Sequence, residues 1–348
     1  MSRLQEFKEV MDQMALAWKR EEKVALVMLI DVKGSAYRLP GTKMMMSSDG
    51  FMFGTISGGC LENDLYGWTE KAWGKNRPLT HKYDLSENDV WSLGIGCKGD
   101  LEILIMPMSP KDSFGITLIE LLQKDQPFSL IVEVHTGRYL AIEETNHIHG
   151  NIENAPFELI EKGKQILKVQ TRAELFACNG QTYVMDAVKS SERLIVAGAG
   201  RDAVPLVELA KKVGFAVTVF DSRTDAHQHS AFSKVQIIRS VEAISREELF
   251  NSWWVIMNHH QEKDEMGLKL AIESKPRYIG VLGPLSRTEK MLKNIRYQLD
   301  SGPIHSPVGL NLGAETMDEV AISIVAEMMS IRAGCQPESL HGAAKIHV

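Results

Sequence analysis

The second half of the chain alternates apolar, strand-like segments with helix-like segments, and this alternation restricts the fold more than any other feature. Regular alternation of this kind favours parallel strands joined by crossover helices that cover both faces of one sheet. The last helical stretch, 315–333, is followed by Gly334, a residue type that commonly ends helices. From Glu192 onward the sequence therefore predicts a Rossmann-like, doubly wound parallel sheet. Its strands are expected at 194–197, 216–220, 235–238, 253–257 and 277–282.

A glycine-rich turn lies between the first of these strands and the first helix. Residues 198–203 read GAGRDA, which matches the pattern G-x-G-x-x-A of phosphate-binding loops. Gly198 would make the tight turn, and Gly200 would let the backbone approach a phosphate. Asp221 stands about 20 positions further on, at the end of the next strand, where it would accept a hydrogen bond from a ribose hydroxyl. The sequence predicts a phosphorylated cofactor here, and a loop kept without a ligand is the alternative.

Two further polar residues follow strands at the same edge of the predicted sheet. Arg223 lies two residues after Asp221, within reach of a second phosphate, and His259 follows the apolar strand 253–257. Ligands of such sheets bind at the carboxyl ends of the strands, so both residues are candidates for cofactor binding. A solvated arginine and a capping or surface histidine are the alternatives.

The first half of the chain contains a cysteine directly after a pair of glycines. Residues 54–62 read GTISGGCLE and connect the apolar stretch 51–53 to a stretch with helical spacing. Cys60 is expected in the first helical turn, where unpaired N–H groups and the helix dipole stabilise a thiolate. Gly58 and Gly59 would let the backbone turn sharply and a ligand approach the sulfur. Cys60 is thus a candidate nucleophile, sulfur carrier or soft metal ligand, and a small buried cysteine is the alternative.

A second cysteine has a similar setting. Residues 94–100 read GIGCKGD, so Cys97 lies among glycines and beside Lys98, before the strand-like run 101–106. A neighbouring cation lowers the pKa of a thiol. Two of the four cysteines in glycine-rich loops of the same half indicate a shared site, with Cys60 and Cys97 as candidate metal contacts.

A polar, basic loop at 34–41 precedes the first of these cysteines. Lys33, Arg38 and Lys43 lie in or beside it. Lysine and arginine from this loop are therefore candidates to stabilise a thiolate at Cys60.

Composition excludes several classes of protein. The 348 residues suffice for two domains, and 44% hydrophobic with 24% charged residues is ordinary for a soluble globular protein. A net charge of -6 argues against nonspecific nucleic-acid binding. Residues 1–22 are too charged for a signal peptide, and the apolar run 24–30 is too short to cross a membrane. Free thiols beside glycines fit a reducing compartment, so we expect a cytoplasmic protein without a disulfide scaffold or a CxxC zinc site.

The pattern divides the chain into a mixed α/β domain, a linker with a hairpin, and the Rossmann-like domain. The linker interpretation depends on the polar residues 147–164, and the hairpin on Asn179-Gly180 between two strand-like runs. The apolar final helix, with Val320, Ile324, Met328 and Met329, and the tryptophan residues suggest a surface for a second protomer, so we expect a homodimer. Core packing explains the same residues. The three parts are residues 1–150, 151–190 and 191–348.

Together, the two halves resemble one family, the XdhC/CoxI proteins, which are accessory factors for xanthine dehydrogenase and related molybdenum hydroxylases. The glycine–cysteine motifs carry more of the resemblance than the Rossmann loop, which many families share. The N-terminal resemblance covers GSAYRLPG at 34–41, then 54–62 and 94–102. The C-terminal resemblance covers 195–223, 255–259, 278–287 and PVGLNLGA at 307–314.

The resemblance implies handling of the molybdenum cofactor (molybdopterin). Family members bind such a cofactor, protect it while its terminal sulfido ligand is installed, and help to insert it into the target enzyme. The implied partners are a cysteine desulfurase and the apo-enzyme of a molybdenum hydroxylase. Molybdenum with dithiolene and sulfido ligands is soft enough to accept a thiolate, which would place Cys60 and Cys97 near the metal. The chain lacks the ferredoxin-like cysteine clusters that a complete xanthine dehydrogenase needs for electron transfer.

Two positions depart from the family pattern. Arg201 stands where the family often has histidine inside the phosphate loop, and a cation there still suits an anionic ligand. Asn258 stands before His259, where threonine is common.

An NAD(P)-dependent oxidoreductase that uses the Rossmann loop and an acid/base residue such as His259 is the alternative function. No hydride-transfer dyad is visible in the sequence, and the cysteine loops would have no role in that enzyme. A cofactor-binding accessory protein is therefore the favoured prediction.

Overall fold

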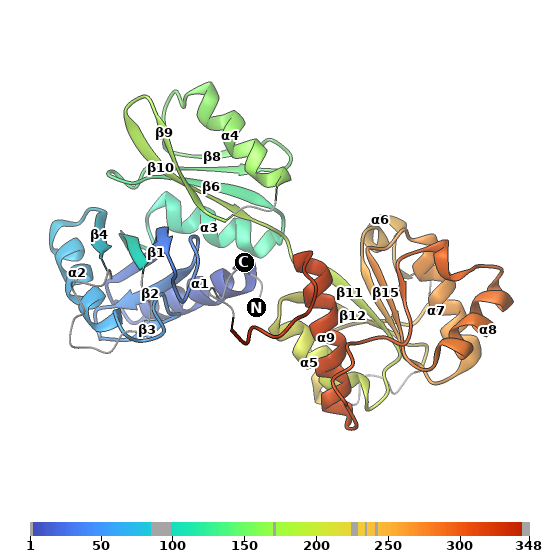
Figure 1. Ribbon diagram of the computed structural model, residues 1–348. Helices are drawn as coiled ribbons and strands as arrows, with labels where there is room; N and C mark the ends of the chain where they lie inside the picture. The colour runs from blue at the N-terminus through green and yellow to red at the C-terminus, as the bar shows by residue number, and fades with distance from the viewer. Residues whose placement is uncertain are drawn as a thin grey trace. The chain divides into compact units, whose positions relative to one another are not determined.

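Two compact units make up the chain. The computed structural model describes residues 3–84, 99–169, 172–223, 229–233, 235–240 and 243–342. Arg3–Ser190 form one unit, drawn from blue to green in Figure 1, and Ser191–His341 form the other, drawn from yellow to red. Each unit has its own hydrophobic core.

The first sheet of the N-terminal unit has five antiparallel strands in the order β3-β2-β1-β5-β4. Its central strand, β1 (Val24–Gly34), is buried over residues 24–30. Side chains alternate along a strand, so the even-numbered ones share a core with α1 (Arg3–Lys19) and the odd-numbered ones with α2 (Glu62–Lys75). The uninterrupted apolar run therefore reflects a strand covered on both faces. The other strands are β2 (Lys43–Ser47), β3 (Met52–Phe53), β4 (Leu79–Tyr83) and β5 (Gly99–Met108).

The second sheet of this unit is also antiparallel, in the order β8-β7-β6-β10-β9. Helix α3 (Ser113–Lys124) packs on one face through residues such as Leu118, and α4 (Phe157–Lys168) packs on the other through Leu159 and Ile166. Figure 1 shows the two helices on opposite sides of the strands. The strands are β6 (Phe128–Glu133), β7 (Tyr139–Glu143), β8 (Ile148–Gly150), β9 (Glu174–Cys178) and β10 (Gln181–Val188).

One core joins the two sheets, because buried residues of α1, α3 and both sheets belong to the same cluster. The N-terminal unit is thus layered as α2, first sheet, α1 with α3, second sheet, α4. A buried ion pair between Lys43 of β2 and Asp186 of β10 also links the sheets.

The C-terminal unit is a six-stranded parallel sheet in the order β13-β12-β11-β14-β15-β16. If the six strands are renumbered 1 to 6 in chain order, the sheet has the order 3-2-1-4-5-6, which is the strand order of dinucleotide-binding folds. The predicted Rossmann-like fold is therefore confirmed. One face is covered by α5 (Ala203–Lys212) and α9 (Met317–Ala333), the other by α7 (Gln261–Glu273) and α8 (Leu285–Ile295). A short α6 (Arg246–Leu249) precedes the fourth strand. The strands are β11 (Glu192–Ala197), β12 (Phe215–Phe220), β13 (Gln236–Ile238), β14 (Trp253–Ile256), β15 (Tyr278–Val281) and β16 (Ile304–His305).

Several elements differ from the sequence-based expectation. Residues 147–164 are not a loop throughout, since they contain β8 and most of α4. Residues 151–190 supply two of the five strands of the second sheet. The apolar stripe of α4 is narrow, with only Leu159, Gly163 and Ile166 buried, so its polar residues concealed the helix. Helix α2 begins at Glu62, which places Cys60 before the helix and not in its first turn.

The final helix ends at Gly334 in the left-handed conformation, as predicted. Ile324 and Met328 of this helix are buried in the core of the C-terminal unit, so these two residues do not supply a surface for a second protomer. The two-residue strand β16 was missed because it is too short to leave a pattern.

Candidate functional site

The glycine–cysteine loop, residues 54–61, leaves one end of the first sheet. The loop after β1 and the connection between β4 and β5 leave the same end, because Gly34 pairs with Gly99 and Gly54 lies against Lys43 at the start of β2. Topology therefore gathers at one edge the segments that the sequence singled out. Cys97 lies outside the described residues, in the connection between β4 and β5.

The carboxylate of Glu62 organises this loop from the inside. Its Oε1 accepts hydrogen bonds from Thr55 Oγ1 at 2.6 Å and from the N–H groups of Ile56 and Ser57, both at 3.0 Å. Its Oε2 accepts from the Ser57 hydroxyl and from two further N–H groups, those of Gly59 at 3.0 Å and Leu61 at 3.1 Å. The side chain that receives these bonds is 8% exposed. One buried carboxylate thus satisfies most donors of the loop.

The electrostatics of Glu62 follow from this arrangement. Burial by itself raises the pKa of the carboxyl group, but the hydrogen bonds from Ser57 and Thr55 and from the N–H groups of Ser57 and Ile56 outweigh it and lower the pKa to about 2. Glu62 is therefore ionised at physiological pH. The sequence predicted no role for Glu62, because its function depends on how its side chain folds back onto the residues that precede it.

The thiol of Cys60 is exposed and free. Gly58 and Gly59 before it have φ angles of 81° and 106°, which residues with a Cβ rarely adopt, so the loop needs glycine here to curl around the Glu62 carboxylate. The N–H groups on either side of Cys60, those of Gly59 and Leu61, are not open to a ligand, because Glu62 accepts hydrogen bonds from both. The alternative of a small buried cysteine is wrong for Cys60.

Two of the three basic residues near this loop, Lys43 and Arg38, are paired elsewhere, while Lys33 is exposed. Lys43 is 4% exposed and pairs with Asp186, and Arg38 pairs with Glu6 of α1. Neither serves as a free cation for Cys60, which corrects that part of the expectation.

The glycine-rich loop of the C-terminal unit follows β11 as predicted. Gly198 has a φ of 124°, and a Cβ there would lie 2.7 Å from the carbonyl oxygen of Met257, so only glycine fits between the first and fourth strands. Gly200 has no such steric requirement, since a Cβ would meet only the end of the Asp202 side chain. Among the described residues, the N–H groups of 200–202 have no hydrogen-bond acceptor, which leaves them open toward a ligand at the start of α5.

Asp221 closes this loop instead of standing free at the strand end. Its Oδ2 accepts a hydrogen bond from the Ala199 N–H at 2.8 Å, and both oxygens accept from the Arg223 guanidinium. Burial raises the pKa of Asp221, but the hydrogen bonds from Arg223 and from Ala199 outweigh this and lower it. The structure thus brings Asp221 and Arg223, both candidates for cofactor binding, next to each other. They form an ion pair with one another.

His259 is also brought to the loop. Its Nε2 lies 2.5 Å from Oδ2 of Asp202, and its backbone has a φ of 55°. The side chain is 63% exposed. Arg201 of the same loop lines a cavity of about 450 Å³ together with His229 and the start of α9. Asp202 was not singled out from the sequence, because its partner lies 57 residues away.

Behind the loop, a buried carboxylate ties two other strand ends together. Asp264 is fully buried, accepts from the Asn258 N–H at 2.8 Å and pairs with Arg287. Arg287 also donates to the carbonyl of Leu282 at 3.2 Å. Arg287 therefore has a structural role at these strand ends.

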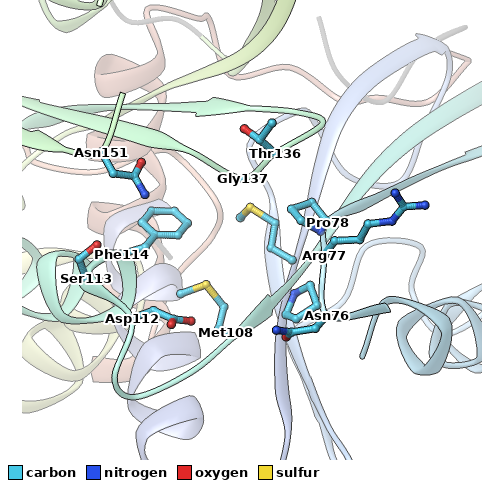
Figure 2. A pocket seen from close by; sticks show the side chains of 12 residues that line it. Asn76, Arg77, Pro78, Met108, Asp112, Ser113, Phe114, Thr136, Gly137 and Asn151 are labelled. Atoms are coloured by element: carbon cyan, nitrogen blue, oxygen red, sulfur yellow. The ribbon is translucent and has the colours of Figure 1, made fainter. Parts of the chain in front are cut away.

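A separate pocket lies at the opposite end of the first sheet, at the end of β5. It has a volume of about 270 Å³, and none of the predicted site residues lines it. Figure 2 shows Asn151, Phe114 and Met108 toward its centre and the Arg77 guanidinium directed away. The 10 residues of β5 span roughly 30 Å, so this pocket is not part of the Cys60 site.

No group of three or more His, Cys, Asp or Glu side chains within the described ranges is arranged to hold a metal ion. Among the described residues, a metal at the Cys60 loop would therefore depend on that thiol and on ligands that the metal brings itself. In the same part of the chain, no helix is both long and apolar enough to span a membrane.

Two protein-family models match the chain on the segments that carry these loops. Residues 17–84 match the XdhC and CoxI family, and residues 194–328 match the XdhC Rossmann domain. The chain belongs to the XdhC and CoxI family. The first match includes Cys60 and Glu62, the second includes the glycine-rich loop, and Cys97 lies between the two.

The similarity between this XdhC and CoxI family member and its relatives covers most of the chain. A Bacillus subtilis protein, named as a probable component of xanthine dehydrogenase, is 28% identical over 90% of this chain and 94% of its own. The Escherichia coli molybdenum cofactor insertion chaperone PaoD is 24% identical over 88% and 83%. A crystal structure described as a xanthine dehydrogenase from Bacillus halodurans superposes with a TM-score of 0.78 at 28% identity, covering 94% of this chain and 97% of that one. These relatives support an accessory role beside xanthine dehydrogenase.

Proposed function

We propose that this protein binds the molybdenum cofactor and supports its sulfuration and its insertion into a molybdenum hydroxylase of the xanthine dehydrogenase type. The observation that carries the proposal is the exposed Cys60 thiol on a loop that the chain itself holds in place. A thiol is a suitable partner for molybdenum in dithiolene and sulfido ligation. The names of PaoD and of the Bacillus subtilis relative support the same role.

The two loops suit different parts of such a cofactor. Cys60, with Cys97 as a second candidate, would contact the soft metal end. The open N–H groups of 200–202 and the cation of Arg201 suit its phosphate, or the tail of a dinucleotide form. The partners we propose are the apo-hydroxylase, a cysteine desulfurase and a second copy of this chain, in the cytoplasm.

The alternative is an NAD(P)-dependent oxidoreductase. The state of Asp221 does not favour it, because the carboxylate that would accept from a ribose hydroxyl is already bonded to Arg223 and to the loop. The Asp202–His259 pair is the only described feature near the loop that resembles an acid/base device.

Replacing Cys60 with serine tests the proposal. Serine keeps the size of the side chain but substitutes a hard oxygen for a soft sulfur. The molybdenum-to-protein ratio after gel filtration should fall severalfold, and activation of the apo-hydroxylase should be lost. Cys335→Ser, at another exposed cysteine, is the matched control and should keep both. If Cys60→Ser retained as much molybdenum as the wild type and fully activated the apo-hydroxylase, the proposal would be contradicted.

A further inference from the structure

The most elaborate polar network around the Cys60 loop centres on a residue that the proposed function leaves unused. Glu62 accepts hydrogen bonds from the N–H groups of both neighbours of Cys60, Gly59 and Leu61, on the same oxygen. The Leu61 N–H also donates to the Ser57 hydroxyl at 2.8 Å, and that hydroxyl itself donates to Glu62. The peptide units on either side of the thiol are thus fixed by one carboxylate.

Converging N–H groups in a glycine-rich loop normally form an anion site. In the loop of the C-terminal unit, the N–H groups of 200–202 have no acceptor within the part of the chain that the structure describes. In the Cys60 loop, the corresponding groups already surround an anion that belongs to the chain. An oxyanion arriving there would meet the negative charge of Glu62, toward which these four N–H groups already point.

We infer that Glu62 is the positioning residue of Cys60: it holds the loop that presents the thiol, and it restricts the ligand of this loop to a thiophilic metal or sulfur group and excludes phosphate and other oxyanions. The inference rests on the proposed function of Cys60, and it adds that Glu62 acts through the position of that thiol. Glu62 itself touches no ligand, since its oxygens face the loop's own donors.

Chemical rescue tests the positioning role. Glu62→Ala removes the internal anion and leaves a space for a small carboxylate. Hydrogen exchange at the N–H groups of Ile56, Ser57, Gly59 and Leu61 should accelerate at least tenfold, and acetate should restore most of the protection while sodium chloride at equal ionic strength should not. In the wild type, neither acetate nor inorganic phosphate should change the exchange of these groups.

The thiol supplies a second readout that needs no cofactor. The rate of iodoacetamide alkylation at Cys60, divided by the rate at Cys335 in the same chain, should change severalfold in Glu62→Ala and return toward the wild-type ratio with acetate. Glu133→Ala is the matched control. Glu133 lies at the end of β6 in the second sheet, is 1% exposed and pairs with Arg138. This variant should leave the ratio and the loop exchange unchanged.

The outcomes separate this inference from the proposed function. Unchanged loop exchange or an unchanged alkylation ratio in Glu62→Ala, no rescue by acetate, or protection of the wild-type loop by phosphate would overturn the inference. If Glu62→Ala does not fold, Glu62→Gln replaces it. Its amide substitutes an NH2 donor for one acceptor oxygen, and this donor faces the loop's own donors, so the loop should loosen without a loss of side-chain volume. Retention of molybdenum by Cys60→Ser would instead refute the proposed function and leave these measurements valid.

Discussion

The buried ion pair between Lys43 and Asp186 makes a quantitative prediction for the N-terminal unit. The two side chains are 4% and 3% exposed, and Lys43 also donates to the carbonyl of Gly41 at 3.0 Å and lies 4.5 Å above the ring of Phe7. Lys43→Met keeps the length of the side chain and removes its charge. Asp186 is then left in the core without its lysine, and removing one partner of a buried pair costs about 3–5 kcal/mol.

Native-state hydrogen exchange is the suitable assay, because a chain of two units need not unfold in a single step. A loss of about 3 kcal/mol corresponds to a fall of roughly a hundredfold in the protection of the slowest amides. That fall should appear in β2 and β10, while the amides of β11 and β14 in the C-terminal unit serve as the internal control. The double variant Lys43→Met with Asp186→Leu should recover most of the protection, since apolar replacement of a buried pair is often close to neutral.

Two results would refute this reasoning. If Lys43→Met lowered the free energy of unfolding of this unit by less than about 1 kcal/mol, the ion pair would be behaving like an exposed one. An equal loss in β11 and β14 would mean that the change is not confined to the unit that contains the pair.

Three further outcomes are expected. Gly198→Ala should destabilise the C-terminal unit by about 1–3 kcal/mol in thermal unfolding, because of its φ of 124° and the contact with Met257; an unchanged midpoint would contradict this. Gly200→Asp should abolish binding of a phosphorylated ligand with little loss of stability, and equal binding would show that the ligand sits elsewhere. The pKa of Glu62 is lowered in the fold to about 2 from 4.5, so its contribution is complete above about pH 4.5 and is lost as the pH falls toward 2; it amounts to at most about 3 kcal/mol. Acid unfolding of Glu62→Gln should therefore lack that part of the pH dependence seen in the wild type.

What the sequence could reveal was local. The strand–loop–helix at 192–212 was predictable because the pattern, the glycines and the helix are adjacent in the chain. Lys43 was offered as a cation for Cys60 because its actual partner, Asp186, lies 143 residues away in the chain. Cys60 was correctly expected beside a turn. The hydrogen-bond partner of the neighbouring N–H groups could not be predicted, because it depends on how the Glu62 side chain folds back onto the loop.

The pairing of β6 with β10 has a consequence for synthesis of the protein. The strands of the sheet that carries the Cys60 loop are complete once the ribosome has added Met108, yet the core they share with the second sheet includes Val184 and Val188. Until that stretch emerges, the nascent chain presents β6 as an unpaired edge and leaves Lys43 without Asp186. Ribosome pausing before residue 188 would thus prolong exposure of aggregation-prone surface on a chain whose Cys60 thiol has already been made.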